Sequence, residues 1–137
     1  MGEKESSDKI EYVVEFDEVF NLYYTQRFSK STVAKIDDFI DHYVTYGLNN
    51  WKGKIRSSAN VPYNYPDRIA LINKAVKHNL WHVHIGEPIW KKSQNGDYYV
   101  SDWVLQFKKL SNYHIILVEL SWHNPMLLPS DEILKKK

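Results

Sequence analysis

The sequence contains no cysteine, and only five glycines and five prolines are spread over its 137 residues. Without thiols, the chain has no disulfide, no cysteine nucleophile and no thiolate metal site. No apolar run is long enough to cross a bilayer, and the polar N-terminus does not look like a signal peptide. These absences predict a cytoplasmic protein that has no membrane partner.

An excess of charge of one sign is also missing, because 18 basic and 17 acidic residues give a formal net charge of +1. There is no global attraction to nucleic acid, so any such binding must depend on a local cluster of charges. Acidic residues are common in the first third of the chain, whereas most lysines and arginines follow later. This distribution predicts that one end of the molecule is basic.

Aromatic residues, in contrast, are abundant: they make up 15% of the chain, and hydrophobic residues in total make up 43%. This content excludes intrinsic disorder, which requires few aromatic residues and low hydrophobicity. The length allows one sizeable core but not two. We therefore predict a single domain over residues 1–137, in which residues 1–9 form a flexible extension.

The first half of the sequence predicts one strand and two helices. Residues 10–16 read as a strand, and Asp17 is a suitable N-cap for a short helix that continues to Phe28. Ser31 or Thr32 can cap a second helix, whose apolar residues recur at i, i+3 and i+4 spacing until Gly47. Asn, Gly, Ser and Pro residues then interrupt the pattern, so we expect residues 48–67 to form a long irregular segment.

The second half predicts three strands, over residues 79–85, 98–108 and 113–122, and a short tail or helix over residues 131–137. The short turns between the strands favour an antiparallel meander. The third strand is apolar on both faces, which is typical of a central strand. The expected fold is thus α+β: an N-terminal strand, two helices and a three-stranded antiparallel meander. We expect the helices on one sheet face and a ligand on the other.

Two histidines, His82 and His84, carry the strongest functional signal, because they stand two residues apart in a predicted strand. Side chains alternate along a strand, so both imidazoles should project from one face while Trp81, Val83 and Ile85 enter the core. Paired imidazoles on a rigid strand favour a site. Histidines that have only a structural role give the same pattern, so both interpretations stay open at this point.

Several segments within residues 36–134 form a pattern through their order and spacing. They are residues 39–47, the Gly53-Lys54 loop, residues 82–85, Ser101-Asp102 with residues 104–107, and residues 113–120 running into His123. This pattern resembles the RelE/ParE-like toxins of bacterial toxin–antitoxin modules, and most closely their YafO-like branch of ribosome-dependent mRNA interferases. Phe107 stands where that branch has a tyrosine.

The resemblance implies a RelE-like fold and an endoribonuclease that inhibits translation by cleaving mRNA, with no metal or other cofactor. It also implies a cognate antitoxin protein, the ribosome and mRNA as partners. Antitoxins of this kind usually wrap an extended or helical segment over the toxin and cover its basic site with acidic residues.

Cleavage of RNA by transesterification needs a base for the 2′-hydroxyl proton, an acid for the leaving 5′ oxygen and cations around the phosphate. Histidine can be the base or the acid near neutral pH. We predict that His84 and His123 are the acid and base candidates, followed by His82. Asp102, at the start of the next strand, is a candidate for orienting an imidazole, although an aspartate there often only caps a turn.

Basic and aromatic residues of the loop and its neighbours are candidates for holding the RNA. Lys52, Lys54 and Arg56 are predicted to bind phosphate, although isolated surface cations would look the same. Trp51 and Trp90 are predicted to stack on bases. Trp103 should instead enter the core, because it shares a strand face with residues 105 and 107.

Two other functions fit the same residues. His82, His84, Asp102 and His123 offer nitrogen and oxygen donors for a catalytic metal ion, as in a metal-dependent hydrolase. Alternatively, a RelE/ParE-like domain acts as a binding protein that inhibits another target such as DNA gyrase. The clustered histidines favour RNA cleavage over a purely steric inhibitor.

Overall fold

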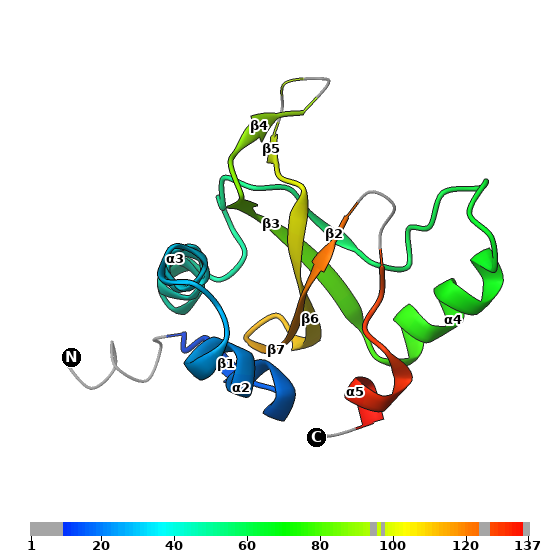
Figure 1. Cartoon of the computed structure of the whole chain (residues 1–137), viewed down its shortest axis with the longest axis horizontal. Helices are drawn as coiled ribbons and strands as arrows, with labels where there is room; N and C mark the ends of the chain where they lie inside the picture. The colour runs from blue at the N-terminus through cyan, green and yellow to red at the C-terminus, as the bar shows by residue number, and fades with distance from the viewer. Residues whose placement is uncertain (1–9, 94–95, 97, 124–126, 136–137) are drawn as a thin grey trace.

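The computed structural model describes residues 10–93, 96, 98–123 and 127–135, and it has an α+β fold (Figure 1). The predicted extension over residues 1–9 lies outside these residues. Helices and strands alternate irregularly along the chain. Their bounds are β1 (Val13–Phe16), α2 (Glu18–Gln26), α3 (Lys30–Tyr46), β2 (Ile55–Ser57), α4 (Arg68–Lys77), β3 (Leu80–Glu87), β4 (Lys91–Lys92), β5 (Tyr99–Val100), β6 (Trp103–Ser111), β7 (His114–Trp122) and α5 (Asp131–Lys135).

Five of the strands form the main sheet, in the order β1-β7-β6-β3-β2. Strands β3, β6 and β7 form the predicted antiparallel meander. The sheet as a whole is mixed, however, because β1 pairs with β7 in parallel. The prediction that the last strand is a central strand is confirmed, since β7 lies between β1 and β6 and contributes buried residues to the clusters on both faces of the sheet. Strands β4 and β5 form a separate hairpin between β3 and β6.

The two N-terminal helices are confirmed, and both begin at side-chain caps. The carboxylate of Asp17 accepts a hydrogen bond from the Val19 N–H at the start of α2 (3.3 Å). Helix α3 begins earlier than predicted, because Ser29 rather than Ser31 or Thr32 is its N-cap and accepts from the Thr32 N–H (3.2 Å). The helix ends at Gly47, whose φ of 71° lies in the left-handed region that favours glycine.

Three elements were not predicted from the sequence: β2, α4 and β4, the last of which pairs with β5. Strand β2 lies inside the segment expected to be irregular, and its three residues pair with β3. Helix α4 fills the gap before β3, and its N-cap Asp67 makes no side-chain capping bond. The strand expected over residues 98–108 is divided into β5 and β6.

Hydrophobic residues cover both faces of the sheet. On one face, α2 and α3 bury Phe20, Ile36, Phe39 and Tyr43 against β3, β6 and β7. On the other face, α4 and α5 form a smaller cluster with the strands, which contains Ala75, Leu80, Val118 and Leu134. The expectation that helices lie on one face only is therefore wrong, as Figure 1 shows. The part of the second face that α4 and α5 leave uncovered contains the histidines.

No helix in the described part of the chain is both long and apolar enough to span a membrane. The predicted turn at residues 94–97 lies largely outside the described residues, as do the last two residues of the predicted tail.

Candidate functional site

His82 and His84 point to the same side of β3, opposite to the core residues Val83 and Ile85, as strand alternation requires. Both imidazoles are nevertheless buried, because His82 is only 5% exposed and His84 only 2%. They form the floor of a pocket of about 420 Å³. The pocket lining consists of Lys54, Arg56, Asn60, Pro62, Asn64, Tyr65, His82, His84, Val100 and His123.

A third imidazole joins this pair from the end of β7. The backbone N–H of His123 donates to the Asp102 carbonyl (2.9 Å), which fixes the chain where it leaves the sheet. The ring centroid of His123 then lies 4.7 Å from that of His84 and 5.4 Å from that of His82. The structure thus brings together all three histidines that the sequence singled out, from two different strands.

A chain of buried hydrogen bonds fixes the protonation of His82. The Gln106 amide Nε2 donates to the Leu127 carbonyl (3.4 Å), so its Oε1 faces Ser58. The Ser58 hydroxyl donates its only proton to that Oε1 (3.0 Å). It must therefore accept from Nδ1–H of His82, 3.0 Å away. In the neutral ring, the proton is on Nδ1 and the lone pair of Nε2 is left for the pocket.

His84 is held by the backbone of Ser101. Its Nδ1 lies 2.8 Å from the Ser101 N–H and 2.9 Å from the Ser101 carbonyl oxygen. An unprotonated Nδ1 accepts from the N–H, and a protonated Nδ1 donates to the carbonyl. One residue can thus orient this ring in both protonation states, which suits a group that transfers protons.

Burial lowers the pKa of each of these histidines. Burial, and next the positive charge of His123, brings the pKa of His82 to about 3 and that of His84 to about 4. The pKa of His123 is lowered by burial and then by Lys54. All three rings are therefore neutral at pH 7 in the unliganded pocket, and a bound anion would raise their pKa values toward neutrality.

Two of the residues predicted to bind phosphate, Lys54 and Arg56, line the pocket from the edge strand β2 and the residue just before it. Arg56 lies opposite His82 in the β2–β3 pairing, and the Lys54 carbonyl accepts from the His84 N–H (3.0 Å). Both cations line the pocket, whereas none of the described lining residues is acidic. Three imidazoles and two permanent cations without a compensating carboxylate make this pocket suited to an anion such as phosphate.

The other two predicted polar residues lie outside this pocket. The Asp102 carboxylate forms an ion pair with Lys91 (2.9 Å) and orients no imidazole. Lys52 lies over the rings of Trp90 and Tyr99, with its Nζ 4.9 and 5.1 Å from their centroids. The structure therefore brings together Lys54 and Arg56 of the predicted phosphate set, and leaves Lys52 apart.

The two tryptophans predicted to stack on bases are half-buried and have structural contacts. Trp51 donates from Nε1 to the His84 carbonyl (2.9 Å) and packs edge to face on Phe39. Trp90 packs close to Gly86, at which a Cβ would come within 2.6 Å of the indole. Trp103 faces the core side as predicted, yet it is 36% exposed, so the expectation that it is buried is wrong.

The metal-site alternative receives no support from the described side chains. No group of three or more His, Asp or Glu residues among them has a geometry that could hold a metal ion. Asp102, the one carboxylate considered for that site, is occupied by Lys91. The remaining metal donors in the pocket are the three imidazole nitrogens. The positive charges of Lys54 and Arg56 beside them would repel a metal ion.

Sequence reasoning did not identify Ser58, Gln106 and Ser101, which hold the imidazoles, or Tyr65, which lines the pocket. Gln106 could have been noticed, because it is one amide inside the apolar run of residues 104–107.

Comparisons of the chain with models of protein families, with curated proteins and with solved structures gave no match.

Proposed function

We propose that the chain is an endoribonuclease that cleaves RNA by transesterification without a metal. The observation that carries the proposal is the convergence of His82, His84 and His123 with Lys54 and Arg56 in one pocket. These groups are the base, acid and cations that the reaction needs. Neutral histidines that become protonated as a phosphate enters are suited to proton transfer at neutral pH.

The geometry favours particular roles within the pocket. His82 is the base for the 2′-hydroxyl, because its tautomer leaves Nε2 unprotonated. His123 is the acid for the 5′ oxygen, since it is the least buried of the three rings and gains a proton most readily. His84 is the third ring of the group, with its centroid 6.3 Å from that of His82 and 4.7 Å from that of His123. Together with Lys54 and Arg56 it stabilises the charge of the pentacoordinate phosphate.

We further propose that the protein is the toxin of a toxin–antitoxin module and acts on mRNA in the ribosome. The resemblance of its segments to YafO-like toxins supports this, and so does the order in which β1, α2 and α3 come before the β3-β6-β7 meander, with β2 and α4 inserted ahead of β3. Its partners would then be a cognate antitoxin, the ribosome and mRNA. The ribosome would position the message and supply groups that the chain lacks, so purified RNA alone is an unsuitable substrate for the test.

The experiment is inducible expression in a bacterial host, with primer extension to map new 5′ ends on translated messages. The variants are His82→Ala, His84→Ala and His123→Ala, and the control is His114→Ala, whose ring pairs with Glu15 away from the pocket (2.6 Å). We expect growth arrest and in-frame cleavage with wild type and control, and neither with the pocket variants. Arrest with intact mRNA would instead indicate a binding protein with another target, and absence of arrest would contradict the toxin proposal.

A further inference from the structure

The outer edge of β7 is only half covered. Strand β1 pairs with β7 as far as Phe16 opposite Leu117, and α2 then begins at Glu18 and leaves the sheet. On the inner side, β6 pairs with β7 as far as Trp122. Within the described ranges, no strand pairs with the outer edge of residues 118–121. An open strand edge is a template for another strand.

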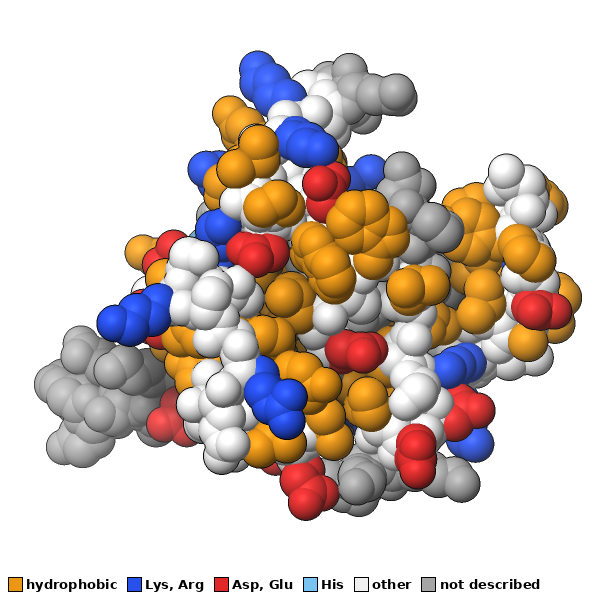
Figure 2. Space-filling model, viewed as in Figure 1, with side chains coloured by type: hydrophobic (Ala, Val, Ile, Leu, Met, Phe, Trp, Pro, Cys, Tyr) orange, Lys and Arg blue, Asp and Glu red, His pale blue; other side chains and the backbone are white. Residues whose placement is uncertain are grey.

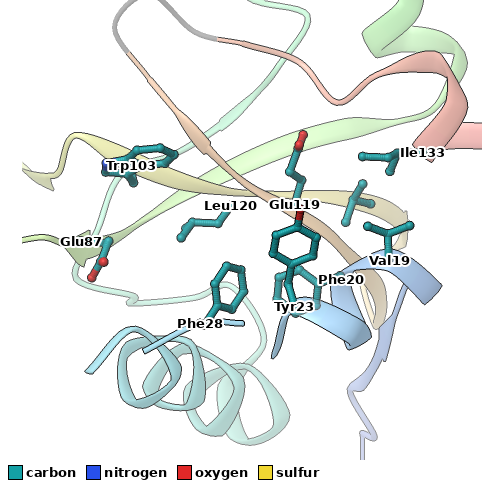
Figure 3. A pocket seen from close by; sticks show the side chains of 10 residues that line it. Val19, Phe20, Tyr23, Phe28, Glu87, Trp103, Glu119, Leu120 and Ile133 are labelled. Carbon is teal, nitrogen blue, oxygen red and sulfur yellow. The ribbon is translucent and has the colours of Figure 1, made fainter. Parts of the chain in front are cut away.

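An apolar groove of about 440 Å³ lies beside this edge (Figure 3). On the α2 side, its wall includes Tyr23, Phe28, Trp103 and Leu120. Tyr23 is 43% exposed and Trp103 is 36% exposed, which leaves two large aromatic side chains partly in water. Figure 2 shows hydrophobic side chains gathered between α2 and α5 on this face. Such patches mark interaction sites.

One carboxylate in the groove, that of Glu119, has no cationic partner among the described residues. Glu119 on β7 is half-buried, and burial raises its pKa. No described residue forms a hydrogen bond or ion pair with it, and Lys74 acts on it only at long range. Glu87 in the same groove differs, because Lys35 pairs with it (3.0 Å). A partly buried carboxylate of this kind is complementary to a lysine or arginine that arrives with a ligand.

Strand alternation gives the two sides of the edge different chemistry. Leu120 faces α2 together with Trp103, whereas Glu119 faces the opposite side, near Ile133 of α5. A strand added at this edge would alternate in the same way. Its side chains would meet an apolar wall on one side and a carboxylate on the other.

We propose that an extended segment of a partner protein, in which apolar residues alternate with lysine or arginine, adds as a strand to the outer edge of β7. Backbone hydrogen bonds along the open edge would give affinity, and the two walls would give specificity. A second copy of the chain fits less well, because pairing of two such edges would bring two unpartnered Glu119 carboxylates together.

This docking groove is separate from the histidine pocket. The two share no lining residue, and they lie toward opposite edges of the sheet, beside β7 and β2 respectively. Their charges are also opposite, since the histidine pocket is lined by cations and the groove by carboxylates. The inference does not rest on the proposed nuclease function.

The test is titration of the isotope-labelled full chain with a short synthetic peptide in which valine and lysine alternate. We expect saturable binding with amide shifts at Glu119 and Leu120, roughly tenfold tighter than binding of the matching valine–glutamate peptide. Glu119→Gln should abolish the preference for lysine. The control Glu132→Gln removes an exposed carboxylate from α5 and should retain the preference.

A second measurement does not depend on any variant that could misfold. The valine–lysine peptide with every backbone amide methylated has no N–H to donate from either edge, and it should lose its binding to wild-type protein. Equal binding of both charge patterns, or undiminished binding of the methylated peptide, would overturn the proposal. So would a concentration-dependent dimer that protects the amides of residues 118–121, because the edge would then belong to a second copy.

Discussion

His84 and His123 lie edge to face with ring centroids 4.7 Å apart, although one is on β3 and the other follows β7, and β6 separates these strands. His123 reaches across because its backbone is bonded to Asp102, immediately before β6. The contact exists only when β3, β6 and β7 are in the correct register. A change in that register would separate the imidazoles without altering any of them.

The first prediction concerns the tautomer of His82. Ser58→Ala removes the acceptor of Nδ1–H, so His82 should populate both neutral tautomers, and a buried N–H left without a partner costs about 1–3 kcal/mol of stability. Nitrogen-15 NMR of the imidazole reports the tautomer directly. Cleavage in cells should fall by roughly tenfold, corresponding to about 1.4 kcal/mol in the barrier.

The matched control is Ser57→Ala, because the neighbouring hydroxyl accepts from the Ala59 N–H and does not contact a histidine. It should leave the imidazole spectrum and the cleavage unchanged. A single Nδ1–H tautomer in Ser58→Ala would show that the Ser58–Gln106 chain does not set the protonation of His82.

The second prediction is a dependence of stability on pH. In the folded protein, the pKa values of His82 and His84 are about 3 and 4, below the value near 6.5 of the unfolded chain. The unfolded state therefore binds more protons below pH 6.5, and the folded state loses stability as the pH falls. Between pH 7 and pH 5 we expect a loss of roughly 2 kcal/mol for each of these two histidines.

Urea unfolding at several pH values measures this slope. His82→Gln should reduce it by about half, because one of the two strongly shifted groups is removed. An identical slope in His82→Gln and wild type would mean that burial of this imidazole does not depress its pKa.

Much of the fold could be predicted because its signals are local. Asp17 and Gly47 mark where α2 begins and α3 ends, and the period-2 pattern placed both histidines of β3 on one face. Helix α4 gave no such signal. Only Ala75 is fully buried in it, and Ile69 and Val76 are 66% and 61% exposed, so its apolar residues do not form one clear stripe.

The rest of the site depends on long-range pairing, which local patterns do not contain. Strand β2 has three residues and exists through its register with β3, which also places Arg56 beside His82. Ser58 and Gln106 meet His82 only once β2, β3 and β6 are aligned. The backbone of Ser101 makes the shorter contacts to the His84 Nδ1, at 2.8 and 2.9 Å, whereas its hydroxyl lies 3.5 Å away. A contact made mainly by the backbone leaves no signal in the sequence.

The third prediction is anion binding at the cationic side of the pocket. An RNA oligonucleotide with a 2′-deoxy substitution at the cleavage position is a suitable uncleavable probe for fluorescence anisotropy. Lys54→Ala and Arg56→Ala should each weaken binding by roughly tenfold, because each removes a charge-assisted contact to phosphate. Lys92→Ala, an exposed lysine on the β4–β5 hairpin, is the control and should bind like wild type. Equal losses in all three variants would indicate a general charge effect instead of a site.

The fourth prediction concerns Gly53, which allows the loop before β2 to approach β3. A Cβ at this position would come within 2.1 Å of the His84 carbonyl oxygen and 2.9 Å of the Trp51 Nε1 that donates to it. Gly53→Ala must therefore displace the segment that carries Lys54. We expect a loss of about 1–3 kcal/mol in the free energy of unfolding, as in other overpacked sites, together with weaker binding of the oligonucleotide.

Gly96→Ala separates this effect from a general cost of removing a glycine. Gly96 has a φ of 78°, so alanine is strained there, but its Cβ would meet no atom within 4 Å and the position is remote from the pocket lining. This variant should lose stability and keep the oligonucleotide affinity of wild type. If Gly53→Ala also bound the oligonucleotide as tightly as wild type, the position of Lys54 would not depend on the contact between Gly53 and His84. The pairing of β2 with β3 would then be what positions Lys54 in the pocket.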